Sequence, residues 1–260
     1  GQWRPGRFRP EPHLLPLSRL PGGGFRHLGA RGQGNNGAPE RNASSIGLVK
    51  AALEASVGLD PFGLHGDGRH VLWVPPDAVL RLRRSLEALL PRESASKEVD
   101  SGCLAVIGYP AWGVEVEELR SRTQAAIHRE LGGRYGYSRF RRDGHQTVVE
   151  DSTRLHYEPE ELACFEGIEC QWPLFLAFEL VSACMEERWP QARDLDQHLQ
   201  QLAVQRGEDC LLPELYRVPE AAVQAERRSP GSQPREANEN VPLLWSQSLW
   251  LLGQLLLAGW

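Results

Sequence analysis

Apolar residues recur at helical spacing through most of the chain after residue 43. Ile46, Val49 and Leu53 lie three or four residues apart, which is the period of one face of an α-helix. The pattern predicts a helix that Ser44 caps at its start and Gly58 ends.

The same spacing predicts six further helices. They are expected at residues 77–90, 100–107, 115–131, 173–187, 190–205 and 242–259. Asp77 and Asp100 are predicted N-caps, and the paired helices at 173–187 and 190–205 each begin on a proline, which suits the first turn. Long polar loops and only short extended pieces, at 70–74 and 211–216, separate these segments. Paired helices with almost no strands predict an all-α fold.

Residues 1–40 have a different composition from the rest of the chain. They are rich in Gly, Pro and Arg and carry few apolar residues in any periodic order. Such a segment cannot bury enough apolar surface to offset the conformational entropy lost on folding. We therefore expect a disordered N-terminal segment at 1–40, followed by a folded domain at 41–260.

Composition narrows the class of protein without identifying it. Hydrophobic residues make up 41% of the 260 residues and charged residues 24%, as in ordinary globular domains. The net charge of -5 gives no reason to expect nucleic acid as a partner. The five cysteines form no Cys-x-x-Cys pair, which argues against disulfides and zinc and for a reducing, cytoplasmic location. No stretch approaches the roughly 20 apolar residues of a membrane span.

Two polar blocks carry the most informative residues. Residues 134–147 and 165–175 mix Arg, Tyr, Asp, Glu and Trp with no periodicity that core packing would require. Carboxylates and guanidinium groups bind hydroxyls, and aromatic rings cover the apolar faces of sugars, so the mixture suits a sugar pocket. The alternative is a solvated loop between two helices. The candidate carbohydrate-binding residues are Tyr135, Arg142, Asp143, Glu169, Trp172 and Glu214.

Glu169 and Glu214 are carboxylates in apolar or aromatic surroundings. Burial beside aromatic rings raises the pKa of a carboxyl group, which suits proton transfer. A pair of carboxylates is also the minimum for glycoside hydrolysis. The alternative is that each one caps a helix or pairs with an arginine.

Other motifs point to little chemistry. The 77–90 helix carries Arg81, Arg83 and Arg84 beside leucines, as calmodulin targets do, but a basic outer face on a core helix is the favoured interpretation. The histidines show no ligand spacing, and there is no Gly-rich phosphate loop. We expect no metal, no cofactor and no kinase catalytic domain.

From about residue 40 onward the chain closely resembles the regulatory subunits of phosphorylase b kinase, the alpha subunit in particular. The resemblance lies in ordered blocks at 41–55, 89–94, 96–100, 134–147, 157–162, 167–175, 212–219 and 244–249. The block at 212–219, Leu-Pro-Glu-Leu-Tyr-Arg-Val-Pro, is of the alpha type.

The resemblance implies a glucoamylase-like (α/α)6 toroid of inner and outer helices. It also implies a regulatory role in glycogen breakdown, in which the subunit holds the kinase catalytic (gamma) subunit under calcium and phosphorylation control. The beta subunit and calmodulin (delta) complete that complex, which activates glycogen phosphorylase. Full-length members are expected to be prenylated lipoproteins at the cytoplasmic face of the plasma membrane. This chain lacks the prenylation motif and most of the N-terminal half of the toroid, so it resembles a fragment or truncated isoform.

The resemblance also suggests roles for individual residues. Glu214 matches the carboxylate with which glucoamylases activate water, and Glu169 falls in the wall of the sugar pocket. The place of the general acid corresponds to about residues 28–31, Leu-Gly-Ala-Arg, where there is no carboxylate. Inverting hydrolysis needs an acid and a base about 6.5–9.5 Å apart, so we expect Glu214 to be a vestigial base without glycosidase activity. An active glycosidase and a non-catalytic module for glycogen or malto-oligosaccharide are the alternatives.

Overall fold

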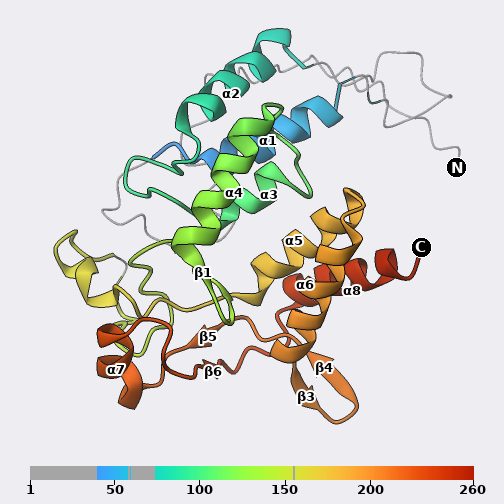
Figure 1. Ribbon diagram of the computed structural model, residues 1–260. Helices are drawn as coiled ribbons and strands as arrows, with labels where there is room; N and C mark the ends of the chain where they lie inside the picture. The colour runs from blue at the N-terminus through green and yellow to red at the C-terminus, as the bar shows by residue number, and fades with distance from the viewer. Residues whose placement is uncertain (1–39, 58, 60–73, 155) are drawn as a thin grey trace, which may run out of the picture.

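A computed structural model describes residues 40–57, 59, 74–154 and 156–260 (Figure 1). The α-helices in these ranges are α1 (Ala43–Ala55), α2 (Pro76–Leu89), α3 (Leu104–Ile107), α4 (Glu117–Leu131), α5 (Pro173–Met185), α6 (Trp189–Leu202), α7 (Val223–Arg228) and α8 (Leu244–Leu257). Short 3-10 turns lie at Ser101–Cys103, Glu161–Phe165 and Glu220–Ala222. The predicted disorder at 1–40, the extended run at 70–74 and the Gly58 helix end fall almost wholly outside the described residues.

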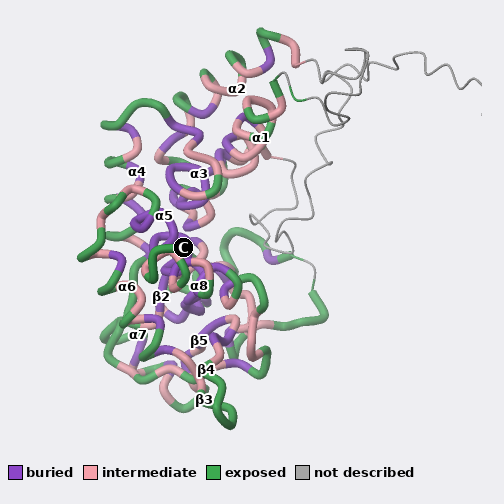
Figure 2. Tube along the Cα trace, turned by 90° about the vertical axis from the view of Figure 1, so that its right-hand side faces the viewer, coloured by how far each residue is buried: buried purple, intermediate pink, exposed green. Residues whose placement is uncertain are grey.

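Helix α5 is the centre of the packing. Its residues 173–184 are all buried, so this mostly apolar helix is surrounded by protein. It packs against α6 and α8 on one side and against α3 on the other, and α3 in turn contacts α1 and α4. Figure 2 shows the buried residues gathered around α3 and α5. The predicted all-α fold is confirmed.

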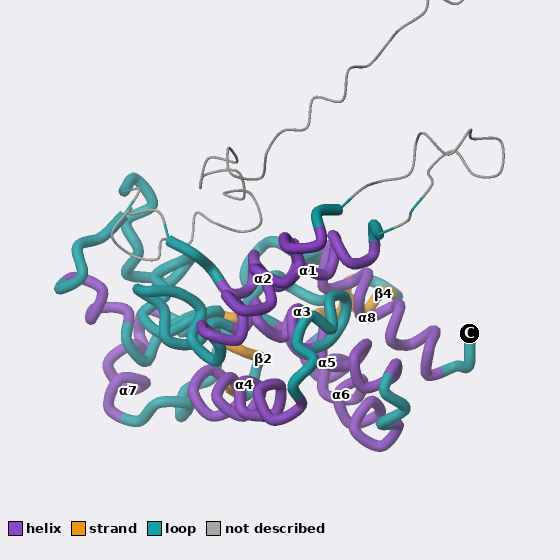
Figure 3. Tube along the Cα trace, turned by 90° about the horizontal axis from the view of Figure 1, so that it is seen from above, coloured by secondary structure: helices purple, strands orange, loops and turns teal. Residues whose placement is uncertain are grey.

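Short strands form three antiparallel pairs at one end of the helices. These are β1 (Gly132–Gly133) with β2 (Gly136–Tyr137), β3 (Val204–Arg206) with β4 (Asp209–Leu211), and β5 (Tyr216–Arg217) with β6 (Glu236–Ala237). Figure 3 shows the long loops and α7 on one side of the molecule, with most of the helices on the other. The predicted polar loops therefore share one end of the fold.

The helix starts show which predicted caps are correct. Asp100 is an N-cap, because its carboxylate accepts a hydrogen bond of 2.8 Å from the backbone N–H of Gly102. The prediction for Ser44 was wrong, since Asn42 precedes α1 and Ser44 lies inside its first turn. Asp77 likewise lies inside the first turn of α2. No helix in the described ranges is long and apolar enough to cross a membrane.

Candidate functional site

Backbone pairing brings the two predicted polar blocks together. Tyr137 pairs with Trp172, and Gln171 pairs with Tyr216, each as an isolated antiparallel bridge. The chain before α5 is thus held between the 134–147 block and the strand that follows Glu214. Residues far apart in sequence meet in one place, which we call the candidate site.

Glu214 is held by two side-chain amides. Its Oε2 accepts hydrogen bonds from Nε2 of Gln146 at 3.0 Å and from Nδ2 of Asn238 at 2.8 Å. The Asn238 amide also donates to Oε1 of Gln146 at 2.9 Å. The arrangement fixes Glu214 as a hydrogen-bond acceptor.

Trp172 has a buried donor without a partner. The side chain of His145 stacks on its ring with centroids 5.8 Å apart, and the guanidinium group of Arg139 lies 5.1 Å from the ring centroid. The indole Nε1 is buried and has no hydrogen-bond partner among the described residues. An unsatisfied buried donor costs about 1–3 kcal/mol, so a ligand oxygen or a water at this position would be stabilising.

Burial and the Arg139 guanidinium both lower the pKa of His145, in that order of size, although nearby carboxylates oppose the shift. The imidazole beside Trp172 is therefore neutral over a wider pH range than an exposed histidine. A neutral ring can both donate and accept a hydrogen bond, which suits recognition of hydroxyl groups.

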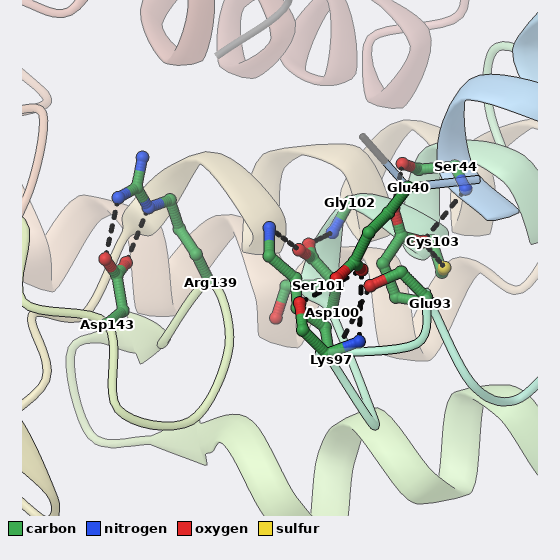
Figure 4. A network of polar contacts seen from close by, with 12 residues as sticks. Glu40, Ser44, Glu93, Lys97, Asp100, Ser101, Gly102, Cys103, Arg139 and Asp143 are labelled. Carbon is green, nitrogen blue, oxygen red and sulfur yellow. Dashed lines mark hydrogen bonds and ion pairs between the residues drawn. The ribbon is translucent and has the colours of Figure 1, made fainter. Parts of the chain in front are cut away.

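Asp143 forms a buried ion pair with Arg139. Its two carboxylate oxygens accept hydrogen bonds of 2.6 and 2.7 Å from the guanidinium group (Figure 4). Burial would raise the pKa of Asp143, but Arg139 and the backbone N–H of His145 outweigh it and hold the pKa below its usual value. Both oxygens are already engaged, so Asp143 shapes the candidate site through Arg139.

Glu169 and Arg142 meet through the backbone. The buried Glu169 carboxylate accepts a hydrogen bond of 2.7 Å from the backbone N–H of Arg142, whose φ of 62° lies in the left-handed region. Burial raises the pKa of Glu169 against the effect of this hydrogen bond, in the direction that the sequence predicted. The Arg142 side chain pairs with Glu166 at the surface.

Tyr135 lies between the first block and a later loop. Its backbone N–H donates to Oε1 of Gln171 at 2.8 Å, and its ring contacts Tyr216 with centroids 4.8 Å apart. Its hydroxyl accepts a hydrogen bond of 3.2 Å from the backbone N–H of Arg235. The 229–235 loop, which precedes β6, therefore closes one side of the candidate site.

A second polar cluster borders the candidate site. The buried carboxylate of Glu93 accepts hydrogen bonds from the backbone N–H of Ser44 at 2.9 Å and its hydroxyl at 2.5 Å, and from Cys103 Sγ at 3.2 Å (Figure 4). The backbone N–H of Ser101 donates to the carbonyl of Arg139 at 2.8 Å. The start of α1 is thus connected to the loop that carries Asp143.

Sequence reasoning missed several of these residues. Arg139, His145 and Gln146 lie inside the 134–147 block. The sequence alone could not show which residues of this block contact Asp143, Trp172 or Glu214. Asn238 lies directly after β6 and follows no local pattern. In the described part of the chain, no three His, Cys, Asp or Glu side chains are grouped so as to hold a metal ion.

The chain is similar to regulatory subunits of phosphorylase b kinase. It is 46% identical over 227 residues to the liver isoform of the alpha regulatory subunit from Takifugu rubripes and to a probable alpha subunit from Drosophila melanogaster. Identity to the skeletal muscle isoform from Oryctolagus cuniculus is 42% over 226 residues. Each match covers 86% of this chain and 18% of the relative. The resemblance seen in the sequence is confirmed, and the chain spans less than a fifth of these relatives.

Solved glycosidases share the fold. A glycosidase in complex with glucose matches with a TM-score of 0.54 and 18% identity, and a wild-type glycosidase matches with a TM-score of 0.52 and 19% identity. The chain covers 53% of each, as expected for a partial (α/α)6 toroid of the glucoamylase type. No protein-family model matches the chain.

Proposed function

We propose that this chain, a homologue over most of its length of the alpha regulatory subunits of phosphorylase b kinase, is a regulatory, non-kinase subunit of such a kinase. The observation that carries the proposal is the 46% identity over 227 residues. The fold carries less weight, because one fold hosts many unrelated functions.

In this proposal the chain contributes to calcium- and calmodulin-dependent control of glycogen phosphorylase activation, and hence to glycogen breakdown. Its partners are the catalytic (gamma) subunit, the beta subunit and calmodulin (delta). The location is cytoplasmic.

The first prediction is that the chain is captured by its partners. When it is co-expressed with the gamma and beta subunits and calmodulin, it should co-purify with them and change the calcium dependence of the kinase. The measurement is affinity purification followed by a kinase assay with and without calcium. Circular dichroism establishes that the chain is folded. A folded chain that binds neither gamma nor beta contradicts the proposal.

We also propose that the glucoamylase-like fold is not catalytic here. Glu214 is engaged by Gln146 and Asn238, and residues 28–31, which match the place of the general acid, contain no carboxylate. Loss of one member of an acid–base pair lowers the rate of hydrolysis by a factor of about 10²–10⁴. The test is an assay of glucose release from maltotriose. Release that rises with the concentration of the chain and is lost in the Glu214→Gln variant would refute the proposal that the fold is not catalytic.

One observation favours a second role, in binding sugar. The unpartnered indole N–H of Trp172 lies beside His145 and Arg139, and flat rings with nearby polar groups are what sugar sites use. Binding of glycogen or malto-oligosaccharide is compatible with a regulatory subunit.

The second prediction tests this role by calorimetric titration with maltoheptaose. Trp172→Phe keeps an aromatic ring but removes the indole N–H donor, and should weaken binding about tenfold, since a lost hydrogen bond of this kind costs about 1–1.5 kcal/mol. Trp245→Phe, at a half-exposed position on α8, is the matched control and should bind like the wild type. Absence of binding by the wild-type chain, or equal affinity for all three proteins, counts against a sugar site at Trp172.

A further inference from the structure

One serine of this chain stands directly before a proline. Ser229-Pro230 is the single Ser-Pro or Thr-Pro pair in the 260 residues, and Arg227 and Arg228 precede it. A proline has no backbone N–H, and it holds the residue before it in an extended conformation. Proline-directed protein kinases bind their substrates as extended segments and select serines by this following proline. Ser229 is therefore a candidate substrate for such a kinase.

The fold presents Ser229 in the form that a kinase needs. Ser229 follows the last residue of α7 with φ -142° and ψ 87°, and residues 229–232 are all exposed. They form a β-turn, in which the backbone N–H of Ser232 donates to the carbonyl of Ser229 at 3.2 Å and Gly231 has a φ of 80°, as type II turns require. Within the described ranges the Ser229 hydroxyl has no hydrogen-bond partner. It is therefore free to react.

A second serine that follows two arginines is not presented in this way. Arg83 and Arg84 precede Ser85, but Ser85 lies inside α2 and is half-buried. The next residue, Leu86, is buried in the core. The helix would have to unfold before a kinase could bind this segment as an extended chain. The fold, and not the arginines, thus singles out Ser229.

The loop of residues 229–235 is held in place by a buried carboxylate. Glu226 accepts hydrogen bonds of 2.9 Å from the backbone N–H groups of Gly231 and Gln233. It also forms the ion pair of 3.2 Å with Arg235 at the end of the loop. The position of the loop therefore depends on a negative charge that lies close to the start of the loop.

We propose that Ser229 is phosphorylated by a proline-directed protein kinase and that the phosphate opens the 229–235 loop. The Ser229 Oγ attacks the γ-phosphorus of ATP, and the new Oγ–P bond replaces the bond between that phosphorus and the β,γ-bridging oxygen. ADP leaves, and the hydroxyl proton passes to the catalytic base of the kinase. The product carries about 1.5 to 2 negative charges at neutral pH. This proposal rests on neither the regulatory nor the sugar-binding role.

The phosphate would act against the contacts that hold the loop. It would lie at the C-terminal end of α7, where negative charge is unfavourable, and three positions after Glu226, whose charge would repel it. An arginine that moved to the phosphate would leave a contact that anchors this region, since Arg235 pairs with Glu226 and Arg227 donates to the carbonyl of Cys164. Both effects favour a loop that moves away from the candidate site.

The third prediction is that a proline-directed kinase phosphorylates the folded 260-residue chain at Ser229. The chain is incubated with ATP and a mitogen-activated protein kinase, and mass spectrometry of its peptides locates the phosphate. Pro230→Ala should lower the initial rate at least about tenfold, because the kinase discriminates between substrates by this proline. Ser85→Ala is the control and should react like the wild type. Absence of phosphate at Ser229, or an equal rate in Pro230→Ala, would overturn the assignment.

Hydrogen exchange tests whether the loop opens. The amides of Gly231 and Gln233 should exchange about three to ten times faster in the phosphorylated chain than in the chain incubated without ATP. Exchange in α5 should not change, which shows that the fold is intact. Ser229→Ala treated with kinase and ATP is the matched control and should keep the slower exchange. Unchanged exchange of both amides after phosphorylation, or equally fast exchange in Ser229→Ala, would contradict the opening of the loop.

Discussion

Replacement of Glu226 by alanine is expected to lower the free energy of unfolding by about 3–5 kcal/mol, the usual cost of breaking a buried ion pair. The Glu226 side chain is fully buried and forms an ion pair of 3.2 Å with Arg235, which is 5% exposed. Removal of the carboxylate would leave the Arg235 charge buried without its partner. The cost is therefore dominated by that charge and not by lost packing.

The same carboxylate also organises the loop beside the candidate site. Its oxygens accept hydrogen bonds of 2.9 Å from the backbone N–H groups of Gly231 and Gln233. Arg235 continues the connection, since its backbone N–H donates to the hydroxyl of Tyr135 and its guanidinium group to the carbonyl of Glu169. Loss of Glu226 should therefore also raise hydrogen exchange over residues 229–237.

Chemical denaturation measures this effect, with Glu220→Ala as the control. Glu220 is a solvent-exposed glutamate six residues earlier, and its replacement should change the free energy of unfolding by less than about 0.5 kcal/mol. If Glu226→Ala is as stable as Glu220→Ala, the buried pair does not hold the loop.

The helices could be predicted because their signal is local. Apolar spacing located α1, α2, α4, α5, α6 and α8 to within a few residues, since each helix buries one face or is wholly buried like α5. One helix, α7 (Val223–Arg228), was not predicted, because its short polar sequence shows no apolar spacing. The other errors lie at the ends, where two partners compete for one side chain. Ser44 has the residue type of a helix cap, but its hydroxyl donates to Glu93, which is 49 positions away in the sequence.

The candidate site could be predicted only in part, because its geometry is set by distant pairings. The sequence singled out the blocks that contain Trp172, Glu169 and Asp143, because charged and aromatic residues gather there without periodicity, and the structure brings the two blocks together. It could not predict that Asn238 and Gln146, which are 92 positions apart, both donate hydrogen bonds to Glu214.

Buried charges are the least predictable feature of all. Lys50 is fully buried, with its ammonium group 2.9 Å from Glu54 and 2.6 Å from Glu115, although lysine is rarely buried unless it is paired. In the helical pattern Lys50 is an ordinary polar position of α1. Only the fold shows that its charge connects α1 to the segment before α4.

Glu93 is expected to make the folded chain less stable as the pH rises. Burial, and then the negative charge of Asp100, raise the pKa of Glu93 to about 7, although Ser44 and Cys103 donate hydrogen bonds to it. The unfolded chain loses this proton near pH 4.5, so between pH 4.5 and 7 the folded state binds more protons than the unfolded state. Stability therefore falls across that range and levels off above it.

The size of the effect follows from the shift in pKa. Each pKa unit corresponds to about 1.4 kcal/mol, so the free energy of unfolding should fall by about 2–3 kcal/mol between pH 5 and pH 8 because of this group. Glu93→Gln keeps an acceptor for Ser44 and carries no titrating proton. It should match the wild type near pH 5 and exceed its stability at pH 8.

The measurement is chemical denaturation of both proteins at several pH values. The difference between their free energies of unfolding cancels the pH dependence that other titrating groups contribute. One such group is His128, whose pKa is raised by its hydrogen bond to Glu179. The control is Glu98→Gln in the same loop, where the glutamate side chain is 74% exposed, and this variant should follow the wild-type slope.

Since Glu93 anchors the first turn of α1, the lost stability should appear first as faster hydrogen exchange at residues 43–47. A Glu93→Gln protein with the wild-type slope would show that this carboxyl group does not take up its proton on folding.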